Sequence, residues 1–449
     1  MNYKESMYNK VVINKQNNTF LLYNTRSCNY VVMDQKESEA FVEALHSEEP
    51  DLTMQNMFLE KGFWVKGEEN EFKDINKNLT VENTFYLTIM PTLACNFRCP
   101  YCFEQHMAQR ITPEIESSIM EYLYERIKGY HRLNVQWYGG EPLLEIEIIE
   151  RLTNKLTRLC RDLNIQYVSS MTTNGFLLSW ENYLKMKKCK VRRFTITIDG
   201  LKENHDATRI QNNGAGSFDI IINNLKEIQK REHSMLSLFT IRTNYTQSSI
   251  ANKDAWEKYL NDNFLFDPRF KYLPRYAWNN SKSTLDVKQY IQFEYDGNVR
   301  TKIFLEGEHI NPDYTMIRNA EKRLISLRNG EDICLAGRPN SIMIAPDGRL
   351  LKCQVCVDEP INVVGKLGLS TEMHQVDRET LNAWEKTRDE YSICGPCWVY
   401  PFCLGKGCAA KTMKEEGLQD RWCRPFINDV NKQLFLLTYN DERRVTMSQ

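Results

Sequence analysis

The chain has 449 residues, of which 42% are hydrophobic and 11% aromatic, so it is long enough for two or three domains with their own cores. Its formal net charge is −1, and no overall positive field favours nucleic acid as a partner. The N-terminal segment lacks an apolar stretch of signal-peptide length, and no run of 18 apolar residues occurs in the sequence. We therefore expect a cytoplasmic protein that binds neither nucleic acid nor membranes.

A cytoplasmic location argues against a disulfide framework for the 14 cysteines, because thiols are kept reduced there. Cys28, Cys160 and Cys189 stand apart from the rest, and we expect them to be buried or idle thiols. The other cysteines fall into close groups on either side of the central region. Metal or iron–sulfur ligation requires such clustering.

Residues 1–75 are predicted to form a small separate unit. Its predicted elements are two strands within residues 10–24, a strand at 29–34, helices at 36–45 and 53–61, and a closing strand at 62–65. The polar stretch 66–78 is interpreted as a solvated linker. An exposed strand edge in such a unit could hold an extended peptide by adding it as a further strand. The alternative is a cap that only packs on the next domain.

The central region alternates predicted strands and helices. The predicted strands are residues 85–92, 135–139, 167–175, 193–200, 236–245 and a weaker candidate at 269–274. Thr112 and Pro113 are typical of a helix start, with Thr112 as the N-cap. This repetition implies an α/β fold with a parallel sheet, wound as an open or closed barrel-like structure. We expect the chemistry at the C-terminal ends of the strands.

Three cysteines follow the first of these strands. Cys95, Cys99 and Cys102 have the spacing C-x3-C-x2-C, which lets three thiolates of one loop face a single inorganic centre. A four-iron cluster held by three thiolates keeps one iron open for a small molecule. The alternative is a zinc loop, for which His106 is near enough to be the fourth ligand.

The C-x3-C-x2-C loop resembles the signature of the radical S-adenosylmethionine (SAM) enzymes. Gly139, Gly140 and Glu141, followed by Pro142, resemble the GGEP motif that positions the amino group of SAM in this family. Paired glycines permit this because they let backbone groups approach a ligand closely. Tyr101 resembles the aromatic residue that packs against adenine. The resemblance implies a partial (β/α)6 barrel similar to a TIM barrel.

Two further positions resemble the family's carboxylate site. Arg209 follows Thr197 by twelve residues, and in sulfatase-maturing relatives a hydroxyl residue and an arginine at this separation hold the SAM carboxylate. An arginine fork pairs with a carboxylate through two hydrogen bonds. Asn174, at the end of the third strand, is a further candidate for SAM binding. A surface arginine is the alternative interpretation of Arg209.

The cysteines near the C-terminus resemble the SPASM domain of peptide-maturing radical SAM enzymes, which carries two auxiliary four-iron clusters. The resemblance implies Cys394, Cys397, Cys403 and Cys423 as ligands of the outer cluster, and Cys334, Cys353 and Cys408 as ligands of the inner one. Between Cys403 and Cys408 there are four residues where the family usually has three. A double zinc domain is the alternative for the region.

The inner cluster departs from the family pattern at one position. Fully ligated relatives have a cysteine six residues after the first ligand, where this chain has Asn340. Either Cys356 fills the fourth site, or that iron is open and binds a substrate thiolate. We favour the open site.

The predicted domains are a leader-peptide recognition domain of winged-helix type at 1–75, a radical SAM partial barrel at 80–310 and a SPASM-type domain at 331–449. Three four-iron clusters and SAM are the expected cofactors. The resemblance implies a maturase of ribosomally made precursor peptides, which removes a hydrogen atom and installs an oxidative cross-link, preferentially a cysteine thioether of the ranthipeptide type. The expected partners are a precursor peptide with a leader and an electron donor such as ferredoxin or flavodoxin.

Two other functions remain as alternatives. An anaerobic sulfatase maturase oxidises a serine or cysteine to formylglycine, but Asn340 and the leader-recognition-like unit argue against it. An iron–sulfur electron carrier or a zinc interaction module would have no chemistry of its own. Incubating the reduced protein with SAM separates these classes, because a carrier releases no 5′-deoxyadenosine.

Overall fold

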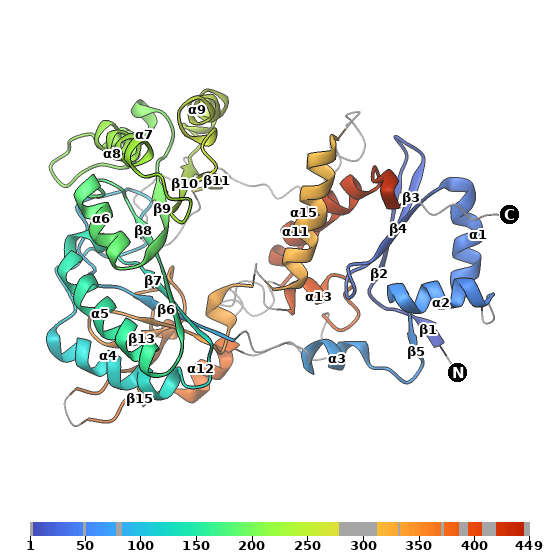
Figure 1. The fold of residues 1–449 in the computed structure, drawn as a ribbon, viewed down its shortest axis with the longest axis horizontal. Helices are drawn as coiled ribbons and strands as arrows, with labels where there is room; N and C mark the ends of the chain where they lie inside the picture. The colour runs from blue at the N-terminus through green and yellow to red at the C-terminus, as the bar shows by residue number, and fades with distance from the viewer. Residues whose placement is uncertain are drawn as a thin grey trace. The chain divides into compact units, whose positions relative to one another are not determined.

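The computed structural model describes eight stretches of the chain, residues 3–47, 51–77, 83–277, 312–330, 333–369, 372–385, 394–405 and 419–443. They belong to two compact units (Figure 1). The first unit comprises residues 1–80, 293–337 and 385–449, and the second comprises residues 81–292 and 338–384. Within the described stretches, no helix combines the length and apolar character needed to cross a membrane.

The second unit is built on a parallel sheet. Its strands are β6 (Thr84–Ile89), β7 (Arg132–Trp137), β8 (Gln166–Thr173), β9 (Val191–Thr197), β10 (Leu238–Tyr245) and β11 (Phe270–Tyr276). Each strand pairs in parallel with the next one along the chain. All six predicted strands are therefore confirmed, together with the partial (β/α)6 barrel.

Helices connect these strands and pack on the sheet (Figure 1). They are α4 (Pro113–Arg126), α5 (Ile146–Asp162), α6 (Trp180–Lys188), α7 (Lys202–Thr208), α8 (Phe218–Arg231) and α9 (Lys253–Leu260). Thr112 caps α4 as predicted, because its side chain accepts a hydrogen bond from the backbone N–H of Ile115. Short 3₁₀ and π segments complete the connections at η1 (Pro142–Glu145), η2 (Ile250–Asn252) and η3 (Asn261–Leu265).

The sheet of the second unit continues beyond the six barrel strands. β12 (Ser341–Ile344) pairs in parallel with β6. The antiparallel strands that follow are β13 (Arg349–Leu351), β14 (Val363–Lys366) and β15 (Gln375–Val376). η7 (Pro360–Asn362) precedes β14, and α12 (Arg378–Glu385) follows β15. Part of the predicted C-terminal domain thus extends the barrel sheet.

The first unit contains a three-stranded antiparallel sheet of β2 (Asn9–Asn14), β3 (Thr19–Asn24) and β4 (Tyr30–Asp34). β1 (Tyr3–Glu5) pairs separately with β5 (Trp64–Lys66). On one face of the sheet, Phe20 and Leu22 share a buried cluster with Phe41 and Phe58. These two phenylalanines come from α1 (Gln35–His46) and α2 (Leu52–Lys61). The predicted strands and helices of the N-terminal segment are confirmed.

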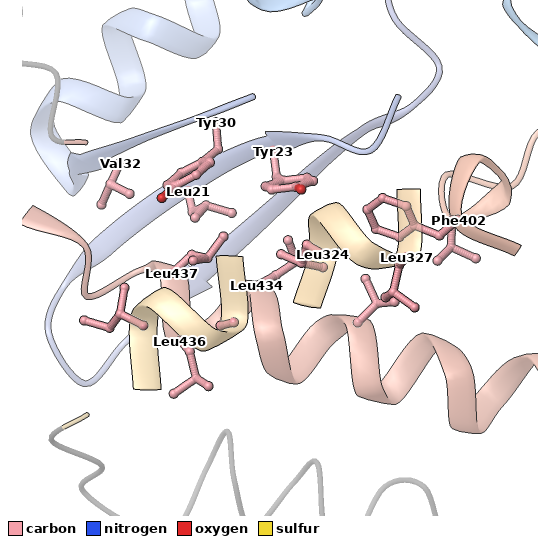
Figure 2. Packing of buried hydrophobic residues seen from close by; sticks show 14 residues of the cluster. Leu21, Tyr23, Tyr30, Val32, Leu324, Leu327, Phe402, Leu434, Leu436 and Leu437 are labelled. Carbon is pink, nitrogen blue, oxygen red and sulfur yellow. The ribbon is translucent and has the colours of Figure 1, made fainter. Parts of the chain in front are cut away.

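The other face of this sheet packs against helices from the C-terminal half of the chain. These are α11 (Tyr314–Arg328), α13 (Tyr400–Cys403) and α15 (Gln419–Leu437), with η6 (Leu335–Gly337) and η8 (Asp441–Arg443) nearby in sequence. Figure 2 shows the shared cluster, in which Leu21 and Tyr23 join Leu324, Phe402 and Leu434. The compact units therefore group the chain differently from the three predicted domains.

The interpretation of residues 66–78 as a solvated linker is wrong. Helix α3 (Glu71–Lys77) lies there, and Phe72 and Ile75 are buried in a cluster with Tyr8 and Tyr400. The carboxylate of Glu71 accepts hydrogen bonds from the hydroxyl of Ser6 (2.6 Å) and the N–H of Met7 (2.9 Å). A polar composition concealed a short helix whose two apolar residues, three apart, face the core.

Candidate cluster and cofactor site

Cys95, Cys99 and Cys102 lie in the loop after β6, and all three side chains are half-buried. The loop is locally ordered, since the N–H of Cys102 donates to the carbonyl of Cys99 (3.0 Å). Burial raises the pKa of Cys95 and of Cys102 to about 12. In the described residues no three His, Cys, Asp or Glu side chains converge on one point as a metal ion requires. The ligand role of the three cysteines therefore remains a prediction from their spacing.

The paired glycines lie directly against this loop. A Cβ at Gly139 would be 2.5 Å from the carbonyl oxygen of Thr92, and a Cβ at Gly140 would be 2.2 Å from that of Ala94. The N–H of Gly140 donates to Thr92 (3.2 Å), and the N–H of Glu141 donates to Ala94 (2.9 Å). Any side chain at either glycine would displace the cysteine loop. The Gly-Gly pair thus positions the segment that precedes Cys95.

The carboxylate of Glu141 is fully buried and forms its hydrogen bonds with other residues of the chain. It accepts hydrogen bonds from the hydroxyl of Thr173 (2.7 Å), the N–H of Asn174 (2.8 Å) and the N–H of Leu143 (3.1 Å). Burial raises its pKa, although these donors oppose the shift. Glu141 therefore connects the end of β7 to the end of β8. The Asn174 side chain in turn donates to Asn96 in the cysteine loop (2.7 Å).

Tyr101 and Arg209, predicted to contact the adenine and the carboxylate of SAM, contact each other in the structure. Nη1 of Arg209 donates to the phenolic oxygen of Tyr101 (2.8 Å), and the Tyr101 hydroxyl donates to the carboxylate of Asp199. Thr197 is buried at the end of β9, two residues before Asp199. Asp199 was missed by the sequence analysis, because in the sequence it looks like an ordinary turn residue before Gly200.

Buried polar atoms without a hydrogen-bond partner gather around the cysteine loop. In the described part of the chain they include Nε of Arg209, Nδ2 of Asn96, Oε2 of Glu104 and Nδ1 of His106. Buried polar groups are normally satisfied, so such a group of exceptions indicates a missing ligand. The free Arg209 edge suits a carboxylate, and the amino-acid end of SAM carries one. The residues present therefore fit SAM.

Glu104 and Tyr138 form a second feature that the sequence analysis missed. The pKa of Glu104 is raised to about 8, mainly by burial and also by Asp358, while a hydrogen bond with Tyr138 opposes the shift. The N–H of Gln105 donates to Asp358 (3.3 Å) and so joins the cysteine loop to the segment after Cys356. No motif marks these residues, because their partners are far away in the sequence.

Cys353 and Cys356 form a thiol pair at the end of β13. A hydrogen bond between the two thiols is the largest cause of the raised pKa of Cys353, and Cys356 is 4% exposed. The buried amide of Asn362 donates to the carbonyls of both cysteines (2.8 and 3.0 Å) and accepts from the N–H of Cys353 (2.8 Å). Both cysteines thus belong to one tightly held turn.

Asn340 stands where the family pattern has a cysteine, and its side chain holds the start of β6. Its side chain donates to the carbonyl of Thr84 at the start of β6 (2.7 Å). The remaining predicted ligands lie in the first unit, where Cys334 is exposed and Cys394, Cys397 and Cys403 are half-buried. Cys408 and the side chain of Cys423 lie outside the described residues. Cys160 and Cys189 are buried thiols, as predicted, and Cys28 is half-buried.

Comparison with known proteins finds sequence similarity in the central segment. Residues 89–249 match the sequence model of the Radical SAM superfamily. The chain is 25% identical over 302 residues to the radical SAM cyclopropyl synthase TigE of Paramaledivibacter caminithermalis, covering 58% of this chain and 60% of that protein. It is 26% identical over 367 residues to a cysteine-type anaerobic sulfatase-maturating enzyme of Clostridium novyi, covering 77% and 94%. The first match spans less than two thirds of the relative's length.

The fold is also found in a solved structure. Native anSMEcpe with bound AdoMet and Cp18Cys peptide superimposes with a TM-score of 0.53 at 20% sequence identity, covering 79% of this chain and 99% of that one. At this identity the likeness concerns the fold.

Proposed function

We propose that this chain, whose residues 89–249 match the sequence model of the Radical SAM superfamily, matures a ribosomally made peptide by an oxidative modification. The observation that carries the proposal is the meeting of three features at the strand ends. They are the cysteine loop, the Gly139–Gly140 pair packed on it, and the buried Arg209 with an unpartnered Nε. The proposed cofactors are SAM and a four-iron cluster on Cys95, Cys99 and Cys102, with auxiliary clusters in the C-terminal region.

Bound to a reduced cluster, SAM supplies a 5′-deoxyadenosyl group that removes a hydrogen atom from an unactivated carbon. The chain orients this chemistry. Arg209 pairs with the SAM carboxylate, Tyr101 packs against adenine, and Gly139 and Gly140 keep the cysteine loop in place. After losing the hydrogen atom, the substrate must also lose one electron and one proton, so the product is two hydrogens lighter. An auxiliary cluster held by the C-terminal cysteines would accept that electron. A ferredoxin or flavodoxin supplies the first electron.

The N-terminal sheet is the proposed binding site for the leader peptide. Strand β2 lies at one edge of the three-stranded sheet, and Val11 and Ile13 on it are 42% and 66% exposed. These residues are two apart, so they point to the same face. An extended leader adding to β2 would gain backbone hydrogen bonds and cover both apolar side chains.

The cross-link is proposed to be a cysteine thioether. A second candidate, formylglycine formation, is favoured by the match over 94% of the length of the Clostridium novyi relative, whose name states that it matures sulfatases. The two outcomes differ in the product, since a thioether consumes a thiol and bonds it to carbon, whereas formylglycine is an aldehyde.

The proposal is tested by anaerobic incubation of the reduced protein with SAM, followed by co-expression with a candidate precursor peptide. We expect 5′-deoxyadenosine and a peptide lighter by two hydrogens that no longer reacts with a thiol-alkylating reagent. A product that reacts with a hydrazine probe would support formylglycine instead. The matched control replaces Cys95, Cys99 and Cys102 by alanine and should give neither product. Colourless protein that contains zinc and no sulfide would overturn the proposal.

A further inference from the structure

Asp199 is a buried carboxylate that joins three separate segments of the second unit. It follows β9 directly and is 1% exposed. One oxygen accepts hydrogen bonds from the Tyr101 hydroxyl and from the Thr208 hydroxyl (3.1 Å). The other accepts from the N–H of Asn244 in β10 (3.0 Å). The cysteine loop, helix α7 and the end of β10 therefore all depend on one side chain.

Arg209 is a buried cation whose neighbours leave one edge free. Arg209 is buried, with 8% of the residue exposed. Nη1 donates to Tyr101 (2.8 Å), and the guanidinium carbon lies 5.5 Å from the centre of the Phe97 ring. Nε is buried and has no partner, and among the described residues no carboxylate pairs with Arg209 directly.

Tyr101 connects these two charged groups. It accepts a hydrogen bond from Arg209 and donates its own proton to Asp199. Because a carboxylate accepts but cannot donate, Asp199 fixes the direction of the Tyr101 hydroxyl. With its proton directed at Asp199, the Tyr101 hydroxyl presents its lone pairs to Arg209. The guanidinium is oriented by donating to them. Hydrogen bonds of this kind strengthen one another in a buried site.

We propose that Asp199 is a positioning residue for SAM: through Tyr101 it holds Arg209 so that the free Nε edge meets the SAM carboxylate. This inference rests on the proposed function, because it concerns the same cofactor. The same relay holds the Tyr101 ring, which is proposed to pack against adenine. Two contacts with SAM therefore depend on one carboxylate that does not touch it. The competing explanation is that Asp199 only fastens β9 to α7.

The test measures SAM binding by calorimetry on the anaerobically purified protein with its cluster, and not turnover. For Asp199→Asn we expect SAM to bind about tenfold more weakly or worse, since a hydrogen bond involving a charged group is lost. Iron content should stay at the wild-type value. Tyr101→Phe breaks the relay but leaves the bonds of Asp199 to Thr208 and Asn244. It should weaken SAM binding to a similar degree, and the double variant should be no weaker than the worse single variant.

Asp206→Asn is the matched control. Asp206 lies in α7, the helix that Asp199 contacts through Thr208, and accepts hydrogen bonds from the N–H groups of Ser217 (2.8 Å) and Phe218 (2.9 Å) at the start of α8. Its loss should lower the melting temperature and leave SAM affinity unchanged. The inference is overturned if Asp199→Asn binds SAM as tightly as the wild type does. It is also overturned if Asp199→Asn and Asp206→Asn lose the same amount of stability and the same amount of SAM affinity. Wild-type protein that binds no SAM would instead refute the proposed function.

Discussion

Gly140 packs against the backbone of Ala94 so closely that a Cβ built on the glycine would lie 2.2 Å from the carbonyl oxygen of Ala94. No real Cβ contact is this short, and the atom it meets is backbone, which cannot rotate away. Ala94 precedes Cys95, the first predicted cluster ligand. The glycine therefore controls the placement of the cysteine loop through steric contact.

The first prediction concerns this contact. Gly140→Ala should displace the cysteine loop and lower the iron bound by the purified protein well below the wild-type value. Gly129→Ala is the control, because a Cβ there meets nothing within 4 Å, although its positive φ of 86° carries a strain of about 1 kcal/mol. Iron analysis and absorption spectra check the outcome. Equal iron content in the two variants would contradict this role of Gly140.

A second prediction follows from the three donors around Glu141. Glu141→Gln keeps the shape but turns an acceptor into an NH₂ group that faces donors. We expect the free energy of unfolding to fall by about 1–3 kcal/mol, the cost of leaving buried donors unsatisfied. Glu145→Gln is the control, since the Glu145 carboxylate makes a 3.8 Å ion pair with Arg110 and accepts no hydrogen bond from the described residues, and a change below about 1 kcal/mol is expected there. Denaturant unfolding measures both.

Much of the fold could be predicted from local patterns. The buried strands alternate or run apolar between turn residues, and the Thr112–Pro113 pair marks its helix start without reference to the rest of the chain. Helix α3 was missed because Phe72 and Ile75 are the only apolar residues of the helix, and their partner Tyr400 is distant in sequence. Propensity alone does not reveal such tertiary packing.

The site, like the fold, has residues that local sequence patterns reveal and residues that only the folded structure reveals. Its cysteines and glycines are recognised by spacing, because adjacent residues of one loop perform one function. Asp199 was missed because its partner Tyr101 is 98 residues away, and only the parallel sheet brings them together. The sequence also could not show what each residue of a motif contacts. The carboxylate of Glu141, for example, is fully used by Thr173, Asn174 and Leu143.

The inner auxiliary cluster supplies a third prediction. The sequence analysis left two choices for the fourth position, Cys356 or an open iron. We propose Cys356, because it lies beside Cys353 and the Asn340 side chain is bound to Thr84. Cys356→Ala should therefore lower bound iron as far as Cys353→Ala does. Cys160→Ala, which removes a buried thiol far from any predicted cluster in the sequence, should retain the wild-type iron content. Unchanged iron in Cys356→Ala would instead support the open site.

The proposed leader site gives a fourth prediction. Val11→Asp and Ile13→Asp should weaken binding of a precursor peptide, because each places a charge where an added strand would cover an apolar side chain. Both residues are exposed, so the melting temperature should change little. Ile325→Asp on α11 is the control, since Ile325 is also exposed, at 45%. Fluorescence anisotropy with a labelled leader measures the affinities, and equal losses in all three variants would count against β2.

The fifth prediction concerns the pH dependence of stability. His205 is fully buried; its Nδ1 accepts from the N–H of Asp199 (3.3 Å), and its Nε2 lies 2.9 Å from the Ser217 hydroxyl. Its pKa is lowered to about 3, mainly by burial and also by Arg209 and Lys202, while Asp206 opposes the shift. The folded protein thus keeps His205 neutral, whereas the unfolded chain protonates it near pH 6.5.

Below that pH the unfolded state binds one proton more than the folded state, so stability falls as the pH falls from about 6.5 toward 3. The loss from this residue approaches about 1.4 kcal/mol per pH unit between pH 6 and 4. His205→Asn removes this term while every other titrating group stays. We therefore expect the free energy of unfolding of the variant to change less steeply with pH over this range. Parallel curves for wild type and variant would show that His205 is charged, or accessible to protons, in the folded protein.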